Sequence, residues 1–460
     1  MLSQHSSSSR TAENHSVVLA NLRAQLLSLF NESMRRIDIT NVMTHAMTVL
    51  GGVLHIGKLS YSLVERRKVV IIAVGKAAIP MCRVAAIIIQ AGLHEGQEIE
   101  GIAVGPGNPD GLPDFIQHFV GGHPLPNDAS REAAETALSL LQPLQEDDLV
   151  LFLISGGASS MLEAPLSPQI SNKQVNEFYR ALVYSGLPIT SMNTLRKHFS
   201  KVKGGRLAFT ASPATQCTLV VSDVPDSALD MVGSGLSLPD PSTVADCRKI
   251  LSKHSVADSL SREVQNYFMD QNLHETPFST DSVFKNSKHL CLLSNKTLLE
   301  QVQSLARQAG FHCEIDNTCD DWHYQDAATY LLERLRTLRK AHKRVCLISG
   351  GELSVKLTEP SGLGGRNQHF ALHCALNLME TDTQVALLSA GSDGVDGNSP
   401  AAGALVDSTT LDRARKLELD PFKALREFDS YSFFEALGDS IVTGPTGNNV
   451  RDLRMFLSCK

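Results

Sequence analysis

The chain has 460 residues, of which 42% are hydrophobic, and a formal net charge of −7 from 42 Lys and Arg against 49 Asp and Glu. This length predicts two domains, and the hydrophobic content is sufficient for a sizeable core in each. The acidic balance argues against a general nucleic-acid-binding protein or a membrane-surface protein, because both usually carry excess basic charge. It is compatible with an anionic small-molecule substrate, since a local basic site can lie on an acidic surface.

The nine cysteines are scattered, their number is odd and no CxxC pair occurs. A disulfide framework and a zinc site are therefore not indicated, and we expect a reduced, cytoplasmic protein. Residues 1–16 are polar and rich in serine, which predicts a disordered tail that is neither a signal peptide nor an anchor. Apolar runs such as 69–74 have the length of strands and are far too short to span a membrane.

Short buried strands alternate with helices in the first half of the chain. After an amphipathic helix at 17–30, runs rich in β-branched residues predict strands, and stretches of helical periodicity lie between some of them. This alternation is typical of a parallel sheet covered by helices. The predicted strands are 69–74, 102–104, 115–120, 149–154 and 217–221, and the predicted helices include 131–141 and 244–253.

A polar stretch at 270–285 is predicted to be a linker, and the alternation resumes beyond it. We therefore expect an N-terminal α/β domain at 17–270 and a C-terminal α/β domain at 286–460. In such domains ligands bind at the loops that follow the carboxyl ends of the strands. The second half is predicted to contain strands at 290–293, 312–315, 344–348 and 385–388, and helices at 297–309 and 324–341.

Two small-residue loops follow strands of the first domain. GKAA (75–78) places Lys76 at a helix start, where it can meet an anion or simply be solvated. SGGASS (155–160) is either a tight turn or a phosphate cradle, because glycines let backbone amides approach a phosphate closely. The chain has neither the Walker A spacing GxxxxGK[ST] nor a GxGxxG motif, so a P-loop NTPase and an ordinary dinucleotide-binding domain are not supported.

The densest basic cluster lies at 193–206 and contains no acidic residue. On a helix, Asn193, Arg196 and Lys197 share one face, which is either an anion-recognition site or a solvated charged surface. Further on, Asp223 lies just past a predicted strand. A carboxylate there can hold Mg²⁺ or accept a proton from a substrate hydroxyl, or it can cap a turn or helix.

The second half carries loops of the same kind. GGRNQ (364–368) opens a helix, and glycines followed by an arginine at a helix start are suited to holding a phosphate or a carboxylate. The loop 389–397, which contains Asp393, misses the EF-hand spacing, so calcium is not expected. Small-residue loops with several cations among them favour phosphoryl transfer, because that reaction requires mainly positioning and charge neutralisation.

Nine short motifs lie at or beside these loops. They are AVGKAA (73–78), GHPLPN (122–127), LISGGASSML (153–162), NTLRKHFSKVKGGRLA (193–208), SDVPDSALDMVGSG (222–235), SGGE (349–352), GGRNQ (364–368), AGSDGVDG (390–397) and TGPTGNN (443–449). With these motifs, the chain resembles the MOFRL-type glycerate kinases, also called class II glycerate 2-kinases. The motifs occur in the same order as in that family, and the resemblance covers nearly the whole chain from about Val17 to the end.

The chain departs from this family's usual pattern at three places. Ala158 stands where the family usually has a glycine, GSGLS (233–237) where it often has ASGPT, and Asn448 where it usually has a threonine. These substitutions keep the loops small and polar, so they bear on substrate preference rather than on reaction class.

The resemblance implies two three-layer α/β domains: the first has a Rossmann-like, mostly parallel sheet, and the second is a smaller, mixed-sheet MOFRL domain. It also implies an enzyme that uses ATP and Mg²⁺ to phosphorylate the 2-hydroxyl of D-glycerate. Lys76 and Arg366 match the family's active-site lysine and arginine, and we expect them to hold glycerate's carboxylate and the transferring phosphate. Asp223 is expected to bind the metal or position the hydroxyl, with Asp393 as a second metal candidate. The expected ATP-phosphate ligands are Ser155, Gly156, Gly157, Ser159, Gly364 and Gly365, and the expected glycerate ligands are Asn193, Arg196 and Lys197.

Two other functions stay open at this point. Members of the family have been labelled hydroxypyruvate reductases, which would require NAD(P)H, and a scaffold of this kind can also serve as a non-catalytic small-molecule sensor. The expected partner is a small molecule, with no nucleic acid and no membrane, and a homodimer is an assembly that the sequence leaves open.

Overall fold

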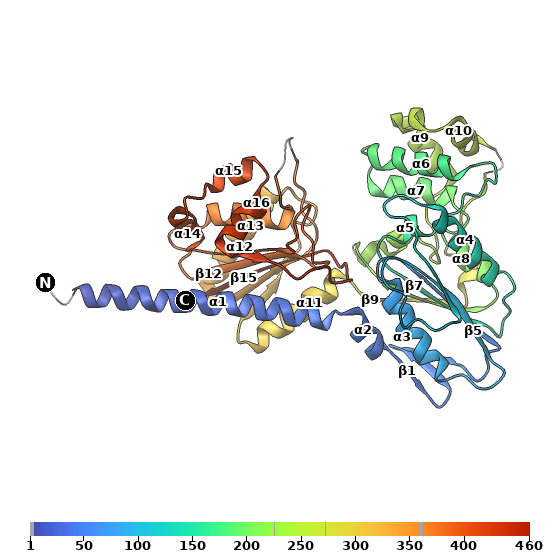
Figure 1. Ribbon diagram of the computed structural model, residues 1–460, viewed down its shortest axis with the longest axis horizontal. Helices are drawn as coiled ribbons and strands as arrows, with labels where there is room; N and C mark the ends of the chain where they lie inside the picture. Colours follow the sequence, from blue (N-terminus) through green and yellow to red (C-terminus); the bar gives the residue numbers. More distant parts are fainter. Residues whose placement is uncertain (1–3, 225, 272, 358–361) are drawn as a thin grey trace. The chain divides into compact units, whose positions relative to one another are not determined.

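The computed structural model describes residues 4–224, 226–271, 273–357 and 362–460 (Figure 1). It divides into two compact units. The central unit is Ile39–Leu292, and the terminal unit combines the residues up to Asp38 with Leu293–Lys460. Both units are α/β, as the sequence predicts, but residues 17–38 belong to the terminal unit rather than to the domain that follows them.

The central unit is built on a six-stranded sheet. In the core of this sheet, β4 (Lys68–Val74) is rich in β-branched residues and buried on both faces, as expected for a parallel strand covered by helices on each side. The neighbours β4–β5, β4–β7, β5–β6 and β7–β8 all pair in parallel. The strand order is β6 (Ile116–Phe119), β5 (Glu98–Val104), β4, β7 (Leu149–Ile154), β8 (Thr215–Val221) and β9 (Ser287–Leu293).

Helices cover both faces of this sheet. α4 (Asp128–Leu141) and α8 (Arg206–Ala211) share a core with alternate residues of β4 and β7, while α3 (Ala78–Gln90) packs on β4 and β5 outside that core. The sequence starts α4 with a capping box, in which the Asn127 side chain accepts from the Ser130 amide and the Ser130 side chain bonds the Asn127 amide. The result is three layers with the loops at the carboxyl ends of the strands left open.

Two further parts of the central unit were not predicted, except for the helix at 244–253, which is confirmed as α9. An antiparallel three-stranded meander precedes the main sheet, and a helical cluster is held by the stacked rings of Phe178, Phe199 and Phe268. The meander is β1 (Met47–Leu50), β2 (Val53–Ile56) and β3 (Leu59–Ser62), preceded by α2 (Ile39–Ala46); the cluster is α6 (Asn172–Tyr184), α7 (Ile189–Phe199), α9 (Val244–Lys253), η2 (Ser255–Ser259) and α10 (Arg262–Met269).

The terminal unit has a six-stranded mixed sheet. Only β10 and β11 pair in parallel, whereas the pairs β11–β15, β12–β15, β12–β13 and β13–β14 are antiparallel. β15, the last strand of the chain, therefore lies in the middle of the sheet. The order is β10 (His312–Ile315), β11 (Arg344–Ser349), β15 (Asp452–Cys459), β12 (Val385–Gly391), β13 (Gly403–Asp407) and β14 (Ser440–Ile441).

Helices also form a layer on each face of the second sheet. One face is covered by α1 (Gln4–Arg36) and α11 (Asn295–Gln308), the other by α12 (Tyr324–Ala341) and α13 (Arg366–Asn377), with α14 (Thr410–Lys416), α15 (Pro421–Arg426) and α16 (Ser430–Leu437) packed around α13. The fold prediction of two three-layer α/β domains, the first with a mostly parallel sheet and the second a smaller domain with a mixed sheet, is confirmed.

The N-terminal segment differs from the prediction. The expected tail at 1–16 and helix at 17–30 are replaced, within the described residues, by the single helix α1 from Gln4. Its apolar stripe, including Leu22 and Leu26, is buried, and α1 packs on β12 and β15. Arg23 adds ion pairs to Asp407, at 2.7 Å, and to Asp439. An amphipathic pattern predicts a buried face but not the sheet that buries it. Across the described ranges, no helix is long and apolar enough to cross a membrane.

Candidate functional site

The loops that follow β4 and β7 interlock in the central unit. The Ser155 amide donates to the Val74 carbonyl at 3.0 Å, the Ala77 amide donates to the Ser155 Oγ at 3.0 Å, and the Lys76 amide donates to the Gly156 carbonyl at 2.9 Å. At Gly75, where φ is +121°, a Cβ atom would lie 2.4 Å from the Ser155 Oγ. A glycine is therefore required here for both conformation and space.

Gly156 and Gly157 lie beside two other predicted site residues, Asp223 and Lys76. A Cβ atom on Gly156 would lie 2.3 Å from an Asp223 carboxylate oxygen, and one on Gly157 would lie 3.5 Å from the Lys76 Cγ. Among the hydrogen bonds of the described residues, neither glycine amide is a donor. Because Gly156 is buried and an unpaired buried amide is costly, this loop is well suited to an anionic acceptor.

The cations beside this loop have no ion-pair partner among the described residues. Lys76 is exposed, and in the described part of the chain no carboxylate lies within ion-pair distance of Lys76 or Arg196. Arg196, on α7, lies over the Tyr179 ring at 4.9 Å, and its buried Nε lacks a hydrogen-bond partner. The Tyr179 hydroxyl donates to the Ser159 carbonyl at 3.0 Å, which links Arg196 to the loop. This edge of the sheet therefore keeps unpaired positive charge.

The other two residues of the predicted glycerate group are buried and already bonded. Asn193 accepts from the Ser234 Oγ at 2.9 Å, and the Ser234 Oγ also bonds the Ser159 Oγ at 2.8 Å. Lys197 is only 3% exposed and forms ion pairs with Asp230 at 2.8 Å and Asp240 at 3.1 Å. The structure gives Lys197 internal partners, so its geometry favours a role in holding the short helix η1 (Asp226–Ser234) over direct contact with a substrate.

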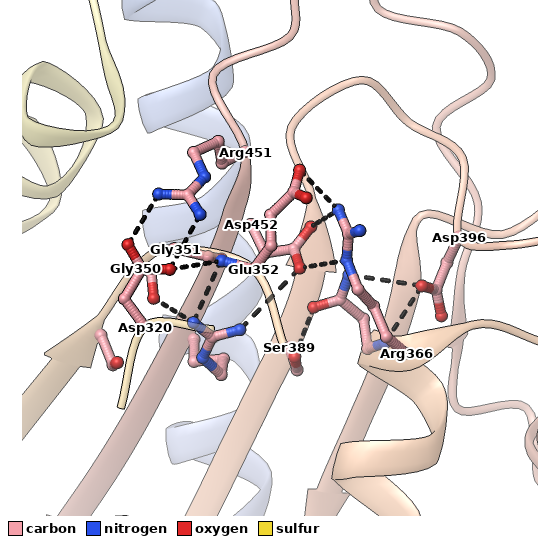
Figure 2. Close-up of polar contacts among 12 residues, drawn as sticks. Asp320, Gly350, Gly351, Glu352, Arg366, Ser389, Asp396, Arg451 and Asp452 are labelled. Carbon is pink, nitrogen blue, oxygen red and sulfur yellow. Dashed lines mark hydrogen bonds and ion pairs between the residues drawn. The ribbon is translucent and has the colours of Figure 1, made fainter. Parts of the chain in front are cut away.

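In the terminal unit, Arg366 lies at the start of α13 in a cluster of charges (Figure 2). It donates to Asp452 from Nε at 2.6 Å and from Nη2 at 3.1 Å, and it pairs with Glu352 at 2.9 Å. Burial lowers the pKa of Arg366, but Asp452, Glu352 and Asp396 more than offset this and raise it. Burial in turn raises the pKa of Glu352. Arg366 is therefore permanently charged and already paired.

The amides at the start of α13 are occupied as well. The Asp396 carboxylate accepts from the Asn367 amide at 3.0 Å and from the Gln368 amide at 2.8 Å, and the Gly364 amide donates to the Asn398 side chain at 2.9 Å. Burial raises the pKa of Asp396 to about 6. A side-chain carboxylate thus fills the helix terminus at which the sequence predicted a phosphate. A Cβ atom on Gly365 would collide with Asp396, which explains the glycine there without a ligand.

A cavity of about 610 Å³ opens beside Arg366, a volume in the range of small-molecule sites. Its walls are partly apolar, and the His369 and Phe428 rings stack at 5.0 Å on one side. Burial lowers the pKa of His369 to about 4, so its ring is neutral at physiological pH. Asp393 also lines this cavity, where its carboxylate and that of Asp452 flank Gly391.

Sequence reasoning missed the charged network that supports the SGGE loop (Figure 2). Arg451, with φ at +69°, forms a bidentate pair with Asp320 at 2.7 and 2.8 Å, and Asp320 accepts from the Glu352 amide at 3.0 Å. The buried Arg454 donates to the carbonyls of Gly350 and Gly351. The one available signal was the dense NNVRDLR segment after the last glycine loop, whose two arginines have partners more than 100 residues away in the sequence.

The fold and its loops define a two-unit α/β protein with glycine-rich, charged edges at the carboxyl ends of its strands. Residues 25–269 match a domain of unknown function, DUF4147, and residues 345–452 match the MOFRL family. The D-glycerate 2-kinase of Thermotoga maritima is 36% identical over 84% of this chain and 89% of its own length. The chain belongs to the MOFRL-type, class II glycerate kinase family.

Two other similarities bear on function. The crystal structure of a glycerate kinase from Thermotoga maritima superposes with a TM-score of 0.82 and 32% identity, over 95% of this chain and all of that one. An Agrobacterium vitis protein whose name gives hydroxypyruvate reductase as a provisional activity is 34% identical over 85% of this chain and 87% of its own length.

Proposed function

We propose that this chain is an ATP-dependent glycerate 2-kinase, which transfers the γ-phosphoryl group of ATP to the 2-hydroxyl of D-glycerate and forms 2-phosphoglycerate and ADP. The family and its glycerate 2-kinase relatives support the reaction class. The observation that carries the proposal is the contact of Lys76, Gly156, Gly157 and Asp223 at one edge of the parallel sheet.

In this proposal the SGGASS loop binds the phosphates of ATP. The amides of Gly156 and Gly157 are available as donors, and the Ser159 hydroxyl and the Ser155 hydroxyl hold the loop in shape. Lys76 neutralises the transferring phosphate, because its exposed side chain has no ion pair in the part of the chain that the structure describes. Positioning and charge neutralisation are the main contributions that phosphoryl transfer requires.

Arg196 is our candidate for the carboxylate of glycerate. Its guanidinium is fixed on the Tyr179 ring, and its charge is not matched by a described carboxylate. Guanidinium groups recognise carboxylates with two parallel hydrogen bonds. Asn193 and Lys197, which the sequence placed in the same group, act in our proposal by holding the loop that contains Ser234.

Magnesium is part of the proposal, and the residues present fit it. Mg²⁺ is commonly held by one or two carboxylates together with substrate phosphates, so a three-residue cluster is not needed. The described residues contain no such cluster of three, but the Asp223 carboxylate lies directly against the Gly156 loop. Asp223 would hold the ion, which when bound offsets phosphate charge. Asp393 remains the second candidate.

Arg366 has a different role in our proposal. Since it is paired with Asp452 and Glu352, it shapes the wall of its cavity and can offer a hydrogen bond to a bound carboxylate or phosphate without a net positive charge. Nucleotide binding by Gly364 and Gly365 stays a prediction, and for Gly364 it would require the Asn398 side chain to release the amide.

The test is ADP release from ATP with Mg²⁺ and D-glycerate as the acceptor. We expect turnover that depends on all three components, and no turnover with D-glycerate would contradict the proposal. A parallel reaction with hydroxypyruvate and NADH or NADPH, followed by absorbance, tests the reductase activity suggested by the Agrobacterium relative's name. Tight binding of ATP or glycerate without turnover would instead indicate a sensor.

We also propose that the protein is cytoplasmic and that it forms a homodimer. Seven of the nine cysteines are buried, where they pack as small hydrophobic side chains. Burial raises the pKa of the Cys82 thiol to about 12, so it is unreactive as a thiolate. Fractionation tests the location, and light scattering tests whether the chain forms the homodimer that its sequence allows.

A further inference from the structure

His123 lies at the same edge of the central sheet but has no role in the function proposed above. It follows β6 in the GHPLPN motif, and its side chain is exposed. A Cβ atom on Gly157 would lie 3.5 Å from the His123 Nδ1 and 3.5 Å from the Lys76 Cγ. The imidazole and the Lys76 side chain therefore flank the open face of the phosphate loop.

The hydrogen bonds around His123 orient its ring. Nδ1 lies 3.1 Å from the Ser160 Oγ, and Ser160 itself lies 3.5 Å from the Gly157 carbonyl, to which it donates. A Ser160 hydroxyl that donates to this carbonyl can accept from Nδ1–H, and this is the tautomer that our inference requires. In this tautomer Nε2 carries a lone pair and can accept a proton.

The charged groups that face His123 favour its neutral form. Partial desolvation of the ring by the surrounding loops is the largest cause that lowers its pKa, and the positive charges of Lys76, on the loop after β4, and Arg196, on α7, lower it further. The contact from α5 (Ala158–Met161) is the uncharged Ser160. A neutral imidazole between two cations is prepared to receive a proton from a hydroxyl that those cations help to bind.

We propose that His123 is the general base of the reaction, with Nε2 accepting the proton of the attacking hydroxyl. The hydroxyl oxygen forms a bond to the γ-phosphorus of ATP as the bond from that phosphorus to the β,γ-bridging oxygen breaks. ADP leaves with the electron pair of the broken bond, and the imidazolium then loses its proton to solvent. This inference rests on the proposed kinase function and keeps the metal-binding role proposed for Asp223.

Two substitutions test the assignment kinetically. His123→Asn can keep a donor near the Ser160 hydroxyl, and His123→Gln places an amide near the Nε2 position, but neither amide can take a proton. Both should lower kcat by about 100- to 10,000-fold with KM for glycerate changed less than about threefold. His55→Gln is the matched control, because the His55 Nδ1 contacts the Ser60 Oγ at 3.0 Å in the meander, and it should leave kcat unchanged.

The pH dependence separates a base from a structural residue. In the wild type, kcat/KM should fall as the pH drops through a pKa below about 6.5, because the base must be unprotonated. In His123→Gln that acid limb should be absent, and in Ser160→Ala it should remain with a shifted pKa. Unchanged kcat in both His123 variants, or an acid limb that persists in them, would overturn the proposal.

A spectroscopic measurement is independent of whether glycerate is the substrate. ¹⁵N NMR of the histidine rings, assigned by comparison with His123→Gln, should show His123 protonated at Nδ1 and unprotonated at Nε2 near neutral pH. The opposite tautomer would refute the assignment even in an active kinase. If the tautomer is as expected but ATP and glycerate give no ADP, it is the proposed function that fails.

Discussion

The two sheet edges of this protein use the same residue types in opposite ways. In the central unit, Lys76 and Arg196 have no ion pair among the described residues. In the terminal unit, Arg366, Arg451 and Arg454 are bonded to carboxylates or carbonyls of their own unit. An unpaired cation can form an ion pair with an anionic ligand, whereas a cation that is already paired stabilises the loop to which it belongs. The comparison indicates that the central edge is built to bind anions and the terminal edge to hold its shape.

Lys76→Met should have the largest effect on catalysis. If Lys76 neutralises the transferring phosphate, removing its charge should lower kcat by about 100- to 1,000-fold. The melting temperature should stay within about 1 °C of the wild type, since an exposed, unpaired side chain contributes little to stability. Steady-state kinetics and thermal melting measure both quantities. Lys58→Met, at an exposed turn of the meander, is the control, and near-normal turnover of Lys76→Met would remove this lysine from the mechanism.

Lys197→Met should have the largest effect on stability. The substitution leaves Asp230 and the fully buried Asp240 without their cation, and breaking a buried ion pair costs about 3–5 kcal/mol. Denaturant unfolding of the wild type and the variant measures this difference. A variant of unchanged stability that loses only glycerate affinity would show that Lys197 contacts the substrate after all.

Arg366→Met should weaken the terminal unit more than it weakens ligand binding. Asp452 is 1% exposed and would lose its bidentate partner, but Arg366 itself is 36% exposed, so solvent screening reduces the cost to about 1–3 kcal/mol. Arg366→Lys should recover only part of this, because an ammonium group cannot make both bonds. Unfolding in denaturant gives the comparison. A large loss of kcat in Arg366→Lys at unchanged stability would move Arg366 from the supporting role to the chemical step.

Arg196→Met should show that Arg196 and its neighbour Lys197 on α7 have different roles. We expect KM for glycerate to rise about 10- to 100-fold while the free energy of unfolding changes by less than about 1 kcal/mol, the reverse of Lys197→Met. Arg180→Met, at an exposed position on α6, serves as the charge-matched control. If KM is the same in both variants, the carboxylate of glycerate is bound elsewhere.

The terminal edge should also show a pH dependence of stability. Burial raises the pKa of Asp396 from 3.8 to about 6, so the folded protein binds this proton more tightly than the unfolded chain. Its contribution to stability is therefore full below about pH 4 and is lost as the pH rises through about 6. Relative to Asp396→Asn, the wild type should lose about 3 kcal/mol in total as the pH rises through both pKa values. A difference that is independent of pH would contradict the raised pKa.

The strands and glycine loops could be predicted because they are local features. A buried β-branched run that ends in small residues identifies both the strand and the loop at its carboxyl end, and this placed Lys76, Gly156 and Asp223 correctly on one edge. Family motifs then supplied the reaction class, which no single loop could indicate.

The charge partners could not be predicted, because they come from distant parts of the chain. The basic cluster at 193–206 lacks acidic residues locally, yet Lys197 meets Asp230 and Asp240, which lie 33 and 43 residues further on. Lys203 is likewise buried against Glu163, 40 residues before it. Arg196, the residue before Lys197, forms no ion pair within the described residues, and neither does Arg206, which bonds the His274 carbonyl. Local composition thus identified the cluster but not which of its cations was free to bind a ligand.

The most direct test of the central claim is the identity of the phosphorylated product. ³¹P and ¹H NMR of a reaction containing the wild-type protein, ATP, Mg²⁺ and D-glycerate should show 2-phosphoglycerate formed in equal amount to ADP. The same reaction with Lys76→Met should show almost none. Formation of 3-phosphoglycerate, or of 2-phosphoglycerate at the same rate in both proteins, would contradict the account of the central edge.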